Sequence, residues 1–318
     1  FFLIYGVLNK PEEKQVDSFD KAVSVDAFDH MELTAKSAYV YDVLENKVIF
    51  KKNEFAQLPL ASITKLMMAL TASELLPPNS RVTIKSEFLK EEGDTGLLAN
   101  ESWKLKDLLD FSLVVSSNDG ARSIASVAGA FDLKTTDYDL GRKDFITKMN
   151  KRAQELGLKQ TYFLNESGLD EGAVSGGYGS AIDVAKLMQH ILLTDPDILE
   201  ATKYQNITVG SLSNTHTAKN TNTEVSNIAG LIASKTGYTE QAGGNLAVVF
   251  DSSIGRPIIV VVLGSTFDGR FEDVSKLAEA LPDTIHASNI TKRVADNIAP
   301  KRLKGFLPSE FDKSYIRN

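Results

Sequence analysis

Residues 59–78 read PLASITKLMMALTASELLPP. The apolar side chains of this stretch recur at helical spacing over residues 61–76, and Pro77-Pro78 ends the run. The stretch therefore predicts a helix over that range. The first turn of the helix carries Ser62 and Lys65, and side chains three positions apart share one helix face. The sequence thus places a hydroxyl and an amine within reach of each other.

Strand-like runs flank this helix in the sequence. A hairpin is indicated before it, because the runs SAYVYD at residues 37–42 and KVIF at residues 47–50 are separated by the turn-forming pair Glu45-Asn46. Near the other end, three apolar runs predict strands and a helical pattern follows them: 231–236, 245–250, 257–263 and 271–281. The middle, at about residues 105–193, reads as several helices. Strands at both ends around a helical middle predict one sheet domain with a helical insertion.

The composition excludes several kinds of function. The 318-residue chain carries a net charge of −7, and an acidic chain lacks the basic face that a nucleic-acid partner usually requires. It contains no cysteine, which excludes disulfides, thiolate catalysis and cysteine metal sites. The four histidines show no pair at metal-ligand spacing: His30, His190, His216 and His286. We therefore expect neither a nucleic-acid partner nor a metal or other cofactor.

Ser62 and Lys65 are a candidate nucleophile and base. A serine hydroxyl is a weak nucleophile until a base takes its proton, and a lysine is a base only where burial or nearby positive charge lowers its pKa. The helix N-terminus adds partial positive charge that favours an oxyanion near Ser62. The spacing alone is weak evidence, because Ser18-Phe19-Asp20-Lys21 shows it in an acidic, linker-like stretch.

A second motif, Ser116-Ser117-Asn118, follows the apolar run Leu113-Val114-Val115. The Ser116 hydroxyl can relay a proton, and the Asn118 amide offers a donor and an acceptor. Serine and asparagine are also preferred at helix N-caps, where no catalysis is needed. Taken alone, the motif indicates a helix cap more strongly than a catalytic group.

A third motif, Lys235-Thr236-Gly237, ends an apolar strand and is followed by Tyr238. Such a strand edge suits a carboxylate. Lys235 supplies charge, Thr236 supplies a hydrogen bond, and Gly237 lets a substrate backbone approach closely. An ordinary strand end with a Thr-Gly turn is the alternative.

The joint presence and order of the three motifs are more specific than any one of them. A serine–lysine helix start, a Ser-x-Asn loop and a late Lys-Thr-Gly strand resemble the penicillin-recognising serine enzymes. Longer runs resemble the D-alanyl-D-alanine carboxypeptidases of peptidase family S11: residues 59–67, 116–121, 165–169 and 235–246. This resemblance extends over roughly residues 32–285.

The resemblance implies an α+β fold of the β-lactamase and transpeptidase type, in which helices flank an antiparallel sheet and an all-helical subdomain is inserted. We expect the serine D,D-peptidase domain at residues 31–285, with the insertion at about residues 77–200. The apolar run at residues 1–8 is too short to span a bilayer, so residues 1–30 are predicted to be an anchor remnant and linker, with a strand or packed terminus as the alternative. Residues 286–318 predict a short, solvated tail, too small for the second β domain that such carboxypeptidases often carry.

The same resemblance implies a role for each motif. Ser62 would be the nucleophile and Lys65 its base. Ser116, helped by Asn118, would pass the proton toward the leaving group. The backbone N–H groups of Ser62 and Tyr238 would form the oxyanion hole, a type of site in which single donors contribute about 3 kcal/mol.

The implied substrate is the D-alanyl-D-alanine end of a peptidoglycan stem peptide. Lys235 and Thr236, on the strand end that includes Gly237 and Tyr238, would hold its terminal carboxylate. Water would then hydrolyse the acyl-enzyme and D-alanine would be released. β-Lactams would acylate the same serine, because they resemble that dipeptide. The protein is therefore expected in the cell envelope, on the outer side of the bacterial cytoplasmic membrane, with any membrane attachment through the N-terminus.

Three other functions stay open from the sequence. A D,D-endopeptidase would use the same site on internal cross-links. A β-lactamase would need a deacylating carboxylate, and Glu166 lies between the second and third motifs, although its run Glu166-Ser167-Gly168-Leu169 matches the carboxypeptidases better. A β-lactam sensor or wall-binding scaffold without turnover could keep the motifs intact.

Overall fold

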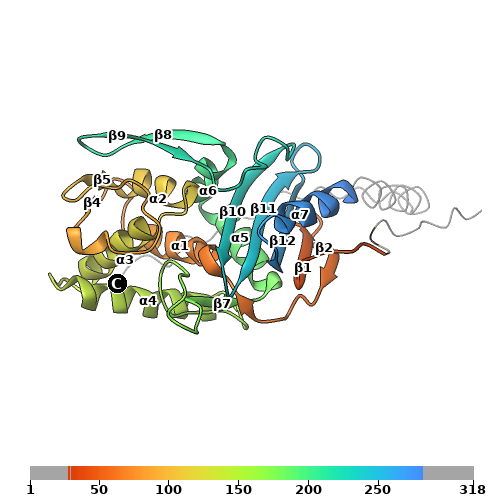
Figure 1. The fold of residues 1–318 in the computed structure, drawn as a ribbon, viewed down its shortest axis with the longest axis horizontal. Coiled ribbons are helices and arrows are strands. Elements are labelled where there is room, and N and C mark those ends of the chain that lie inside the picture. The colour runs from red at the N-terminus through yellow and green to blue at the C-terminus, as the bar shows by residue number, and fades with distance from the viewer. Residues whose placement is uncertain (1–27, 29, 282–318) are drawn as a thin grey trace, which may run out of the picture.

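The computed structural model describes residue 28 and residues 30–281. Within this range an antiparallel five-stranded sheet has the strand order β10-β11-β12-β1-β2 (Figure 1). Its strands are β1 (Ser37–Asp42), β2 (Lys47–Lys52), β10 (Leu231–Thr239), β11 (Gly243–Asp251) and β12 (Pro257–Ser265). Because β1 pairs with β12, the two ends of the domain complete one sheet. The strands predicted from the sequence are confirmed, each to within a few residues.

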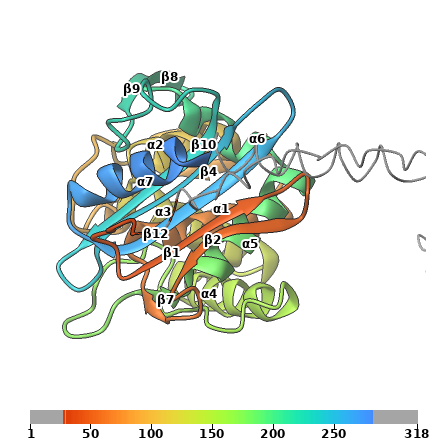
Figure 2. The same ribbon diagram turned by 90° about the vertical axis from the view of Figure 1, so that its right-hand side faces the viewer.

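The central strands are buried on both faces, which explains their nearly continuous apolar runs. On β12, Ile259 belongs to the core that includes helices α1 (Lys65–Leu75) and α5 (Ala181–Thr194), whereas its neighbour Val260 packs with α7 (Gly269–Glu279). Successive side chains of a strand point to opposite faces, so one strand contributes to two cores. Helix α7 crosses the outer face of the sheet (Figure 2).

Most of the other helices and short strands lie beside the sheet, at the left of Figure 1, and β7 (Gly177–Gly179) lies at the lower end of the sheet. The helical elements are α2 (Leu105–Val114), α3 (Asn118–Asp132), α4 (Tyr138–Glu155), α6 (Asp197–Glu200) and the 3-10 turns η2 (Ser86–Phe88) and η3 (Ala201–Lys203). The short strands pair as β4 (Arg81–Thr83) with β5 (Ser102–Lys104), β3 (Leu58–Pro59) and β6 (Tyr162–Phe163) with β7 (Gly177–Gly179), and β8 (Asn206–Gly210) with β9 (Thr215–Lys219). The predicted helical middle and the α+β class are confirmed.

The helix predicted over residues 61–76 begins differently from the expectation. Residues Ala61–Thr64 form a 3-10 turn, η1, and the α-helix α1 starts only at Lys65. Ala61 has a positive φ of 47°, a left-handed conformation that interrupts a regular helical path. Side chains three positions apart are eclipsed in a 3-10 turn. The expected contact between Ser62 and Lys65 is therefore present, although the predicted start of the α-helix at residue 61 was wrong.

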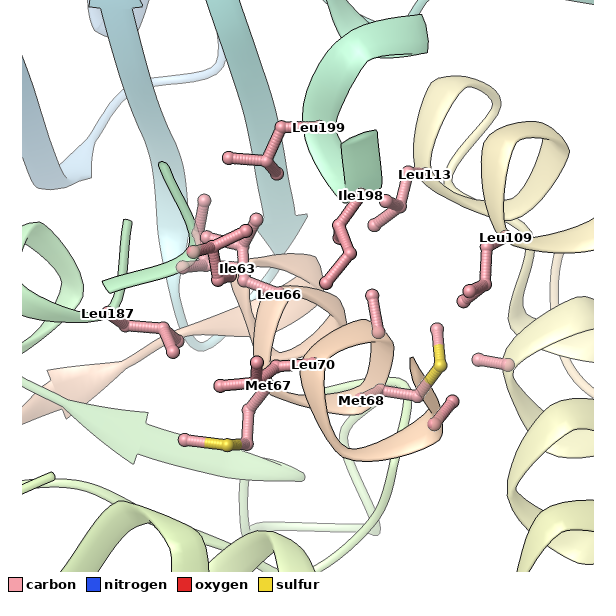
Figure 3. Close-up of a cluster of buried hydrophobic side chains, with 14 of the residues drawn as sticks. Ile63, Leu66, Met67, Met68, Leu70, Leu109, Leu113, Leu187, Ile198 and Leu199 are labelled. Carbon is pink, nitrogen blue, oxygen red and sulfur yellow. The ribbon is translucent and has the colours of Figure 1, made fainter. Parts of the chain in front are cut away.

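Helix α1 is buried on every side from Lys65 to Ala72 and lies in the larger core. Helices α2 to α6 also contribute side chains to this core. Figure 3 labels Leu109 and Leu113 of α2, Leu187 of α5, and Ile198 and Leu199 of α6 around α1. Because interiors are close-packed, α1 cannot shift without disturbing these neighbours. The first turn of α1, with Lys65, is accordingly held in place from several directions.

Three predicted segments lie largely or wholly outside the described residues. They are the N-terminal anchor remnant and linker at 1–30, the tail at 286–318, and the comparison motif at 18–21. Over residue 28 and residues 30–281, no helix has both the length and the hydropathy that a bilayer crossing requires.

The β8–β9 hairpin, which no sequence pattern predicted, is attached to the helical part through Glu101. The Glu101 carboxylate lies 2.6 Å from Ser211 Oγ, 2.9 Å from Asn214 Nδ2 and 2.7 Å from His216 Nε2. The His216 ring in turn lies 4.8 Å from that of Trp103. Burial alone would raise the pKa of Glu101, but the hydrogen bonds outweigh it and lower the pKa from 4.5 to about 2.

Because the pKa of Glu101 is lowered by folding, its ionised form stabilises the fold above pH 4.5, and that contribution is lost as the pH falls toward 2. We expect Glu101→Gln to be less stable than wild type at pH 7 by roughly 1–3 kcal/mol. We also expect it to lose less stability than wild type between pH 4.5 and 2. Denaturant unfolding across this range measures both effects, with the exposed Glu87→Gln as control. Parallel pH dependence in wild type and Glu101→Gln would contradict the assignment.

Candidate active site

The three sequence motifs meet where the sheet adjoins the helices. The turn η1 carries Ser62, the connection between α2 and α3 carries Ser116, the first residue of α3 is Asn118, and β10 carries Lys235 and Thr236. Hydrogen bonds join these elements across 53 residues of sequence, from Lys65 to Asn118, and across 119 residues, from Ser116 to Lys235. Lys65 also contacts Ser62. Within the described part of the chain, no group of three or more histidine, aspartate or glutamate side chains is placed to hold a metal ion.

The amine of Lys65 is the centre of this cluster. Its Nζ donates to Ser62 Oγ at 2.9 Å, to Asn118 Oδ1 at 2.7 Å and to the carbonyl oxygen of Ser167 at 2.8 Å. The side chain is fully buried. Burial lowers the pKa of Lys65 from 10.5 to about 7, against nearby carboxylates, chiefly Glu166, that raise it. The amine can thus lose its proton near neutral pH, which a base for a serine requires.

The amine of Lys235 is buried in the same region. Its Nζ donates to Ser116 Oγ and to the carbonyl oxygen of Thr236, both at 2.9 Å. Burial lowers the pKa of Lys235 well below 10.5, and the positive charges of Lys65 and Arg270 lower it further. Each amine disfavours the charged form of the other, so the titrations of the two lysines are coupled.

The Ser116-Ser117-Asn118 motif contains a helix cap, and the two residues beside the cap each contact a buried lysine. Ser117 is the N-cap of α3, and its Oγ accepts a hydrogen bond from the backbone N–H of Gly120 at 3.0 Å. Asn118 Nδ2 donates to the carbonyl oxygen of Glu92 at 2.6 Å, which leaves its Oδ1 for the lysine amine. Ser116 has a φ of 61°, a sparsely populated conformation for a residue other than glycine. The cap is confirmed at Ser117, while the residues on either side of it each contact a buried lysine.

Gly237 allows β10 to approach the turn that carries Ser62. A Cβ atom at this position would lie 2.7 Å from the carbonyl oxygen of Leu60 and 3.2 Å from the backbone nitrogen of Ser62. The first distance is shorter than side chains tolerate, so any other residue would push the strand away from η1. The sequence predicts that a substrate backbone approaches Gly237 closely. In the structure, the backbone of Leu60 and Ser62 makes a close approach at this glycine.

Asn245 fastens the same turn to the sheet, and it was not among the predicted site residues. Its buried Nδ2 donates to the carbonyl oxygens of Pro59 and Leu60, each at 3.0 Å. Its Oδ1 accepts from the backbone N–H of Gly264 at 2.8 Å. The sequence did contain a signal for Asn245, a polar amide at the start of an apolar strand. A buried polar side chain needs hydrogen-bond partners, so such an amide indicates a structural contact.

Arg270 of α7 is a second residue that the sequence patterns missed. Its guanidinium lies 4.5 Å from the ring centre of Phe267 and 4.7 Å from that of Phe271. Its Nη1 donates to the carbonyl oxygen of Gly237 at 3.0 Å. Burial lowers the pKa of Arg270 from 12.5 to about 10, so it is still charged at neutral pH. It therefore places a permanent positive charge near Lys235. The sequence around Arg270 contains no pattern that would predict this position for its side chain.

Thr236 and Tyr238 complete the candidate binding strand. Thr236 Oγ1 lies 2.6 Å from Thr221 Oγ1, at the segment that follows β9. Tyr238 is 48% exposed and packs edge-on against Phe267, with 5.0 Å between the ring centres. This end of β10 thus combines a hydroxyl with a partly exposed aromatic ring.

The turn at residues 165–168 contributes the Ser167 carbonyl oxygen and holds a carboxylate beside it. Gly168, with a φ of 82°, closes this turn, and Asn165 Oδ1 accepts from its N–H at 2.7 Å. Glu166 is 1% exposed, and its two oxygens accept from Arg142 Nε at 3.0 and 2.8 Å. The Glu166 carboxylate is therefore occupied by a guanidinium.

Comparison of the sequence with known proteins identifies relatives over most of this domain. The pattern of the family described as D-alanyl-D-alanine carboxypeptidase, peptidase family S11, matches residues 21–266. The chain is 31% identical to D-alanyl-D-alanine carboxypeptidase DacF of Bacillus subtilis over 251 residues, which are 77% of this chain and 61% of that protein. It is also 31% identical to the D-alanyl-D-alanine endopeptidase of Haemophilus influenzae, over 68% of this chain and 70% of that protein. The chain thus spans about three fifths of DacF and somewhat more of the endopeptidase.

Solved structures share the fold. Penicillin-binding protein D2 of Listeria monocytogenes in its ampicillin-bound form matches with a TM-score of 0.64 and 27% identity, over 79% of this chain and 98% of that one. The Streptomyces K15 DD-transpeptidase matches with a TM-score of 0.71 and 23% identity, over 79% and 97% of the two chains, which shows the fold alone. The predicted transpeptidase-like fold is confirmed. The chain belongs to peptidase family S11, the D-alanyl-D-alanine carboxypeptidase family.

Proposed function

We propose that this protein is a serine D-alanyl-D-alanine carboxypeptidase, which removes the terminal D-alanine of peptidoglycan stem peptides through an acyl-enzyme on Ser62. One observation carries the proposal. The Lys65 amine lies 2.9 Å from Ser62 Oγ and has its pKa lowered by burial to about 7. Family membership supports the choice of substrate.

In the acylation step, Ser62 Oγ attacks the carbonyl carbon between the two D-alanines while its proton passes to Lys65. The oxyanion that forms is stabilised by the backbone N–H groups of Ser62 and Tyr238. The C–N bond then breaks, and the leaving amine takes a proton through the Ser116 hydroxyl, which contacts Lys235 at 2.9 Å. Water then hydrolyses the ester and restores the serine.

The terminal carboxylate of the substrate is recognised by Lys235 and Thr236 on β10. In the free protein, burial and nearby positive charge disfavour the protonated form of Lys235. An arriving carboxylate favours that form, so substrate binding is accompanied by proton uptake at this amine. The permanent charge of Arg270, held against Gly237, adds to the attraction.

A second candidate function is a D,D-endopeptidase, and one observation favours it. Relatives named as D-alanyl-D-alanine endopeptidases, from Haemophilus influenzae and Pseudomonas aeruginosa, are 31% and 30% identical to this chain. A β-lactamase is less well supported, because the Glu166 carboxylate that would have to serve deacylation is paired with Arg142. Preference for a free terminal carboxylate separates the two peptidases.

The setting of the enzyme follows from this substrate. We place it in the cell envelope, on the outer side of the bacterial cytoplasmic membrane, where stem peptides and β-lactams are available. The peptidase domain is assigned to residues 31–285, with residues 77–200 as its helical insertion.

The first test measures acylation and turnover at Ser62. Wild type should release D-alanine from a stem pentapeptide, and penicillin should add its mass to the peptide that contains Ser62. Ser62→Ala should do neither, because within residues 30–281 the hydroxyl of Ser62 is the one that hydrogen-bonds Lys65. Ser18→Ala, in the motif of identical spacing, should behave like wild type. Labelling of Ser62→Ala at the wild-type level would end the assignment of the nucleophile.

The second test concerns the terminal carboxylate. Loss of one charge-assisted contact lowers binding by about 1.5–3 kcal/mol, or roughly ten- to a hundredfold in kcat/KM. A stem peptide ending in D-alanine amide should therefore react that much more slowly than the free acid, and Lys235→Ala should remove most of the preference. The ratio of the two substrates is the readout, because Lys235 also affects the Lys65 amine. Equal rates on acid and amide with wild type would favour the endopeptidase.

A further inference from the structure

A buried carboxylate lies one residue away from the carbonyl that holds the proposed base. Lys65 Nζ donates to the carbonyl oxygen of Ser167 at 2.8 Å, and the preceding residue is Glu166. The Glu166 side chain is 1% exposed, so water screens its charge poorly. A negative charge in this position favours the protonated form of Lys65, which is the form that cannot accept the serine proton.

Arg142 reaches this carboxylate from a helix that contributes nothing else to the site. It extends from α4, and its Nε lies 3.0 and 2.8 Å from the two Glu166 oxygens. The Arg142 side chain is itself only 21% exposed. A carboxylate paired with a guanidinium acts on its surroundings as a dipole, and the field of a dipole falls off faster with distance than that of a single charge.

Charged groups around the Lys65 amine come from several elements. They are Glu166 with Arg142, Glu91 with Arg122 and Asp119, and Lys235 with Arg270. Glu91, the other carboxylate that raises the pKa of Lys65, also has an arginine partner, with 3.3 Å between Arg122 Nη1 and Glu91 Oε1. The Glu166 pair is the more buried of the two pairs, and Glu166 raises the pKa of Lys65 more than Glu91 does.

We propose that Arg142 is a positioning residue for catalysis, which by pairing with Glu166 keeps Lys65 available as an uncharged base near neutral pH. The pair does not touch substrate; it acts through the base. The inference rests on the proposed roles of Ser62 and Lys65. The inference extends these roles, because it gives the Arg142–Glu166 pair an effect on catalysis in addition to its structural contact between α4 and the 165–168 turn.

The test uses charge removal in a double-mutant cycle, read as a pH profile. Arg142→Gln leaves the Glu166 charge without its partner, so the acid limb of penicillin acylation should move up by about one pH unit, or roughly tenfold slower acylation at pH 6. Glu166→Gln should move the limb down, because an unpaired guanidinium then faces the amine. The double variant should return close to wild type. Lys148→Gln, which removes a cation of α4 paired with Asp132 and Asp144, is the matched control and should not move the limb.

A second measurement makes the inference independent of turnover. The ¹³Cε resonance of Lys65 reports its protonation directly in wild type and in each variant. Absence of penicillin acylation in wild type would sink the proposed function, while the resonance would still measure the effect of Arg142 on Lys65. The inference is overturned if Arg142→Gln is folded by circular dichroism and its Lys65 titrates at the same pH as in wild type. It is also overturned if the double variant shows the same shift of the Lys65 titration as Arg142→Gln.

If Arg142→Gln alone fails to fold, the Lys65 titrations of Glu166→Gln and of the double variant are compared. Equal titrations in these two proteins refute the role of Arg142.

Discussion

The burial of the Lys65 amine is the constraint on which the rest of the site depends. An ammonium group in water would keep its proton, and only removal from water brings the pKa of this one down to about 7. The structure meets the cost of burial with three oxygen acceptors taken from three separate segments: η1, the start of α3 and the 165–168 turn. Each of these segments must therefore keep its position for the amine to stay in this state.

The sheet and the helices contribute different parts of the arrangement. Gly237 lets η1 approach β10 closely and Asn245 bonds the residues before η1 to β11, so Ser62 is placed by the sheet. Ser116 precedes α3 and Asn118 begins it, so both are placed by the helices. Helix α1, buried against both, carries the lysine that joins the two sets of groups (Figure 3). The site consequently exists only where both parts pack on α1.

Much of this could be predicted from the sequence, because the signals were local. The strands were evident from apolar runs, and the three motifs from their order and spacing. Asn245, Arg270 and Arg142 were missed because their roles depend on contacts with residues distant in sequence or on a helix without a distinctive pattern. The 3-10 turn was missed because a left-handed Ala61 has no compositional signal.

The left-handed backbone of Ser116 has a consequence for how this protein can change. A non-glycine residue in that conformation costs about 1–2 kcal/mol relative to glycine. Glycine at 116 would therefore relax the loop, but it would also remove the hydroxyl that lies 2.9 Å from the Lys235 amine. Backbone strain and the contact with Lys235 therefore oppose each other at position 116, and the hydrogen bond is kept at a conformational cost that glycine would not carry.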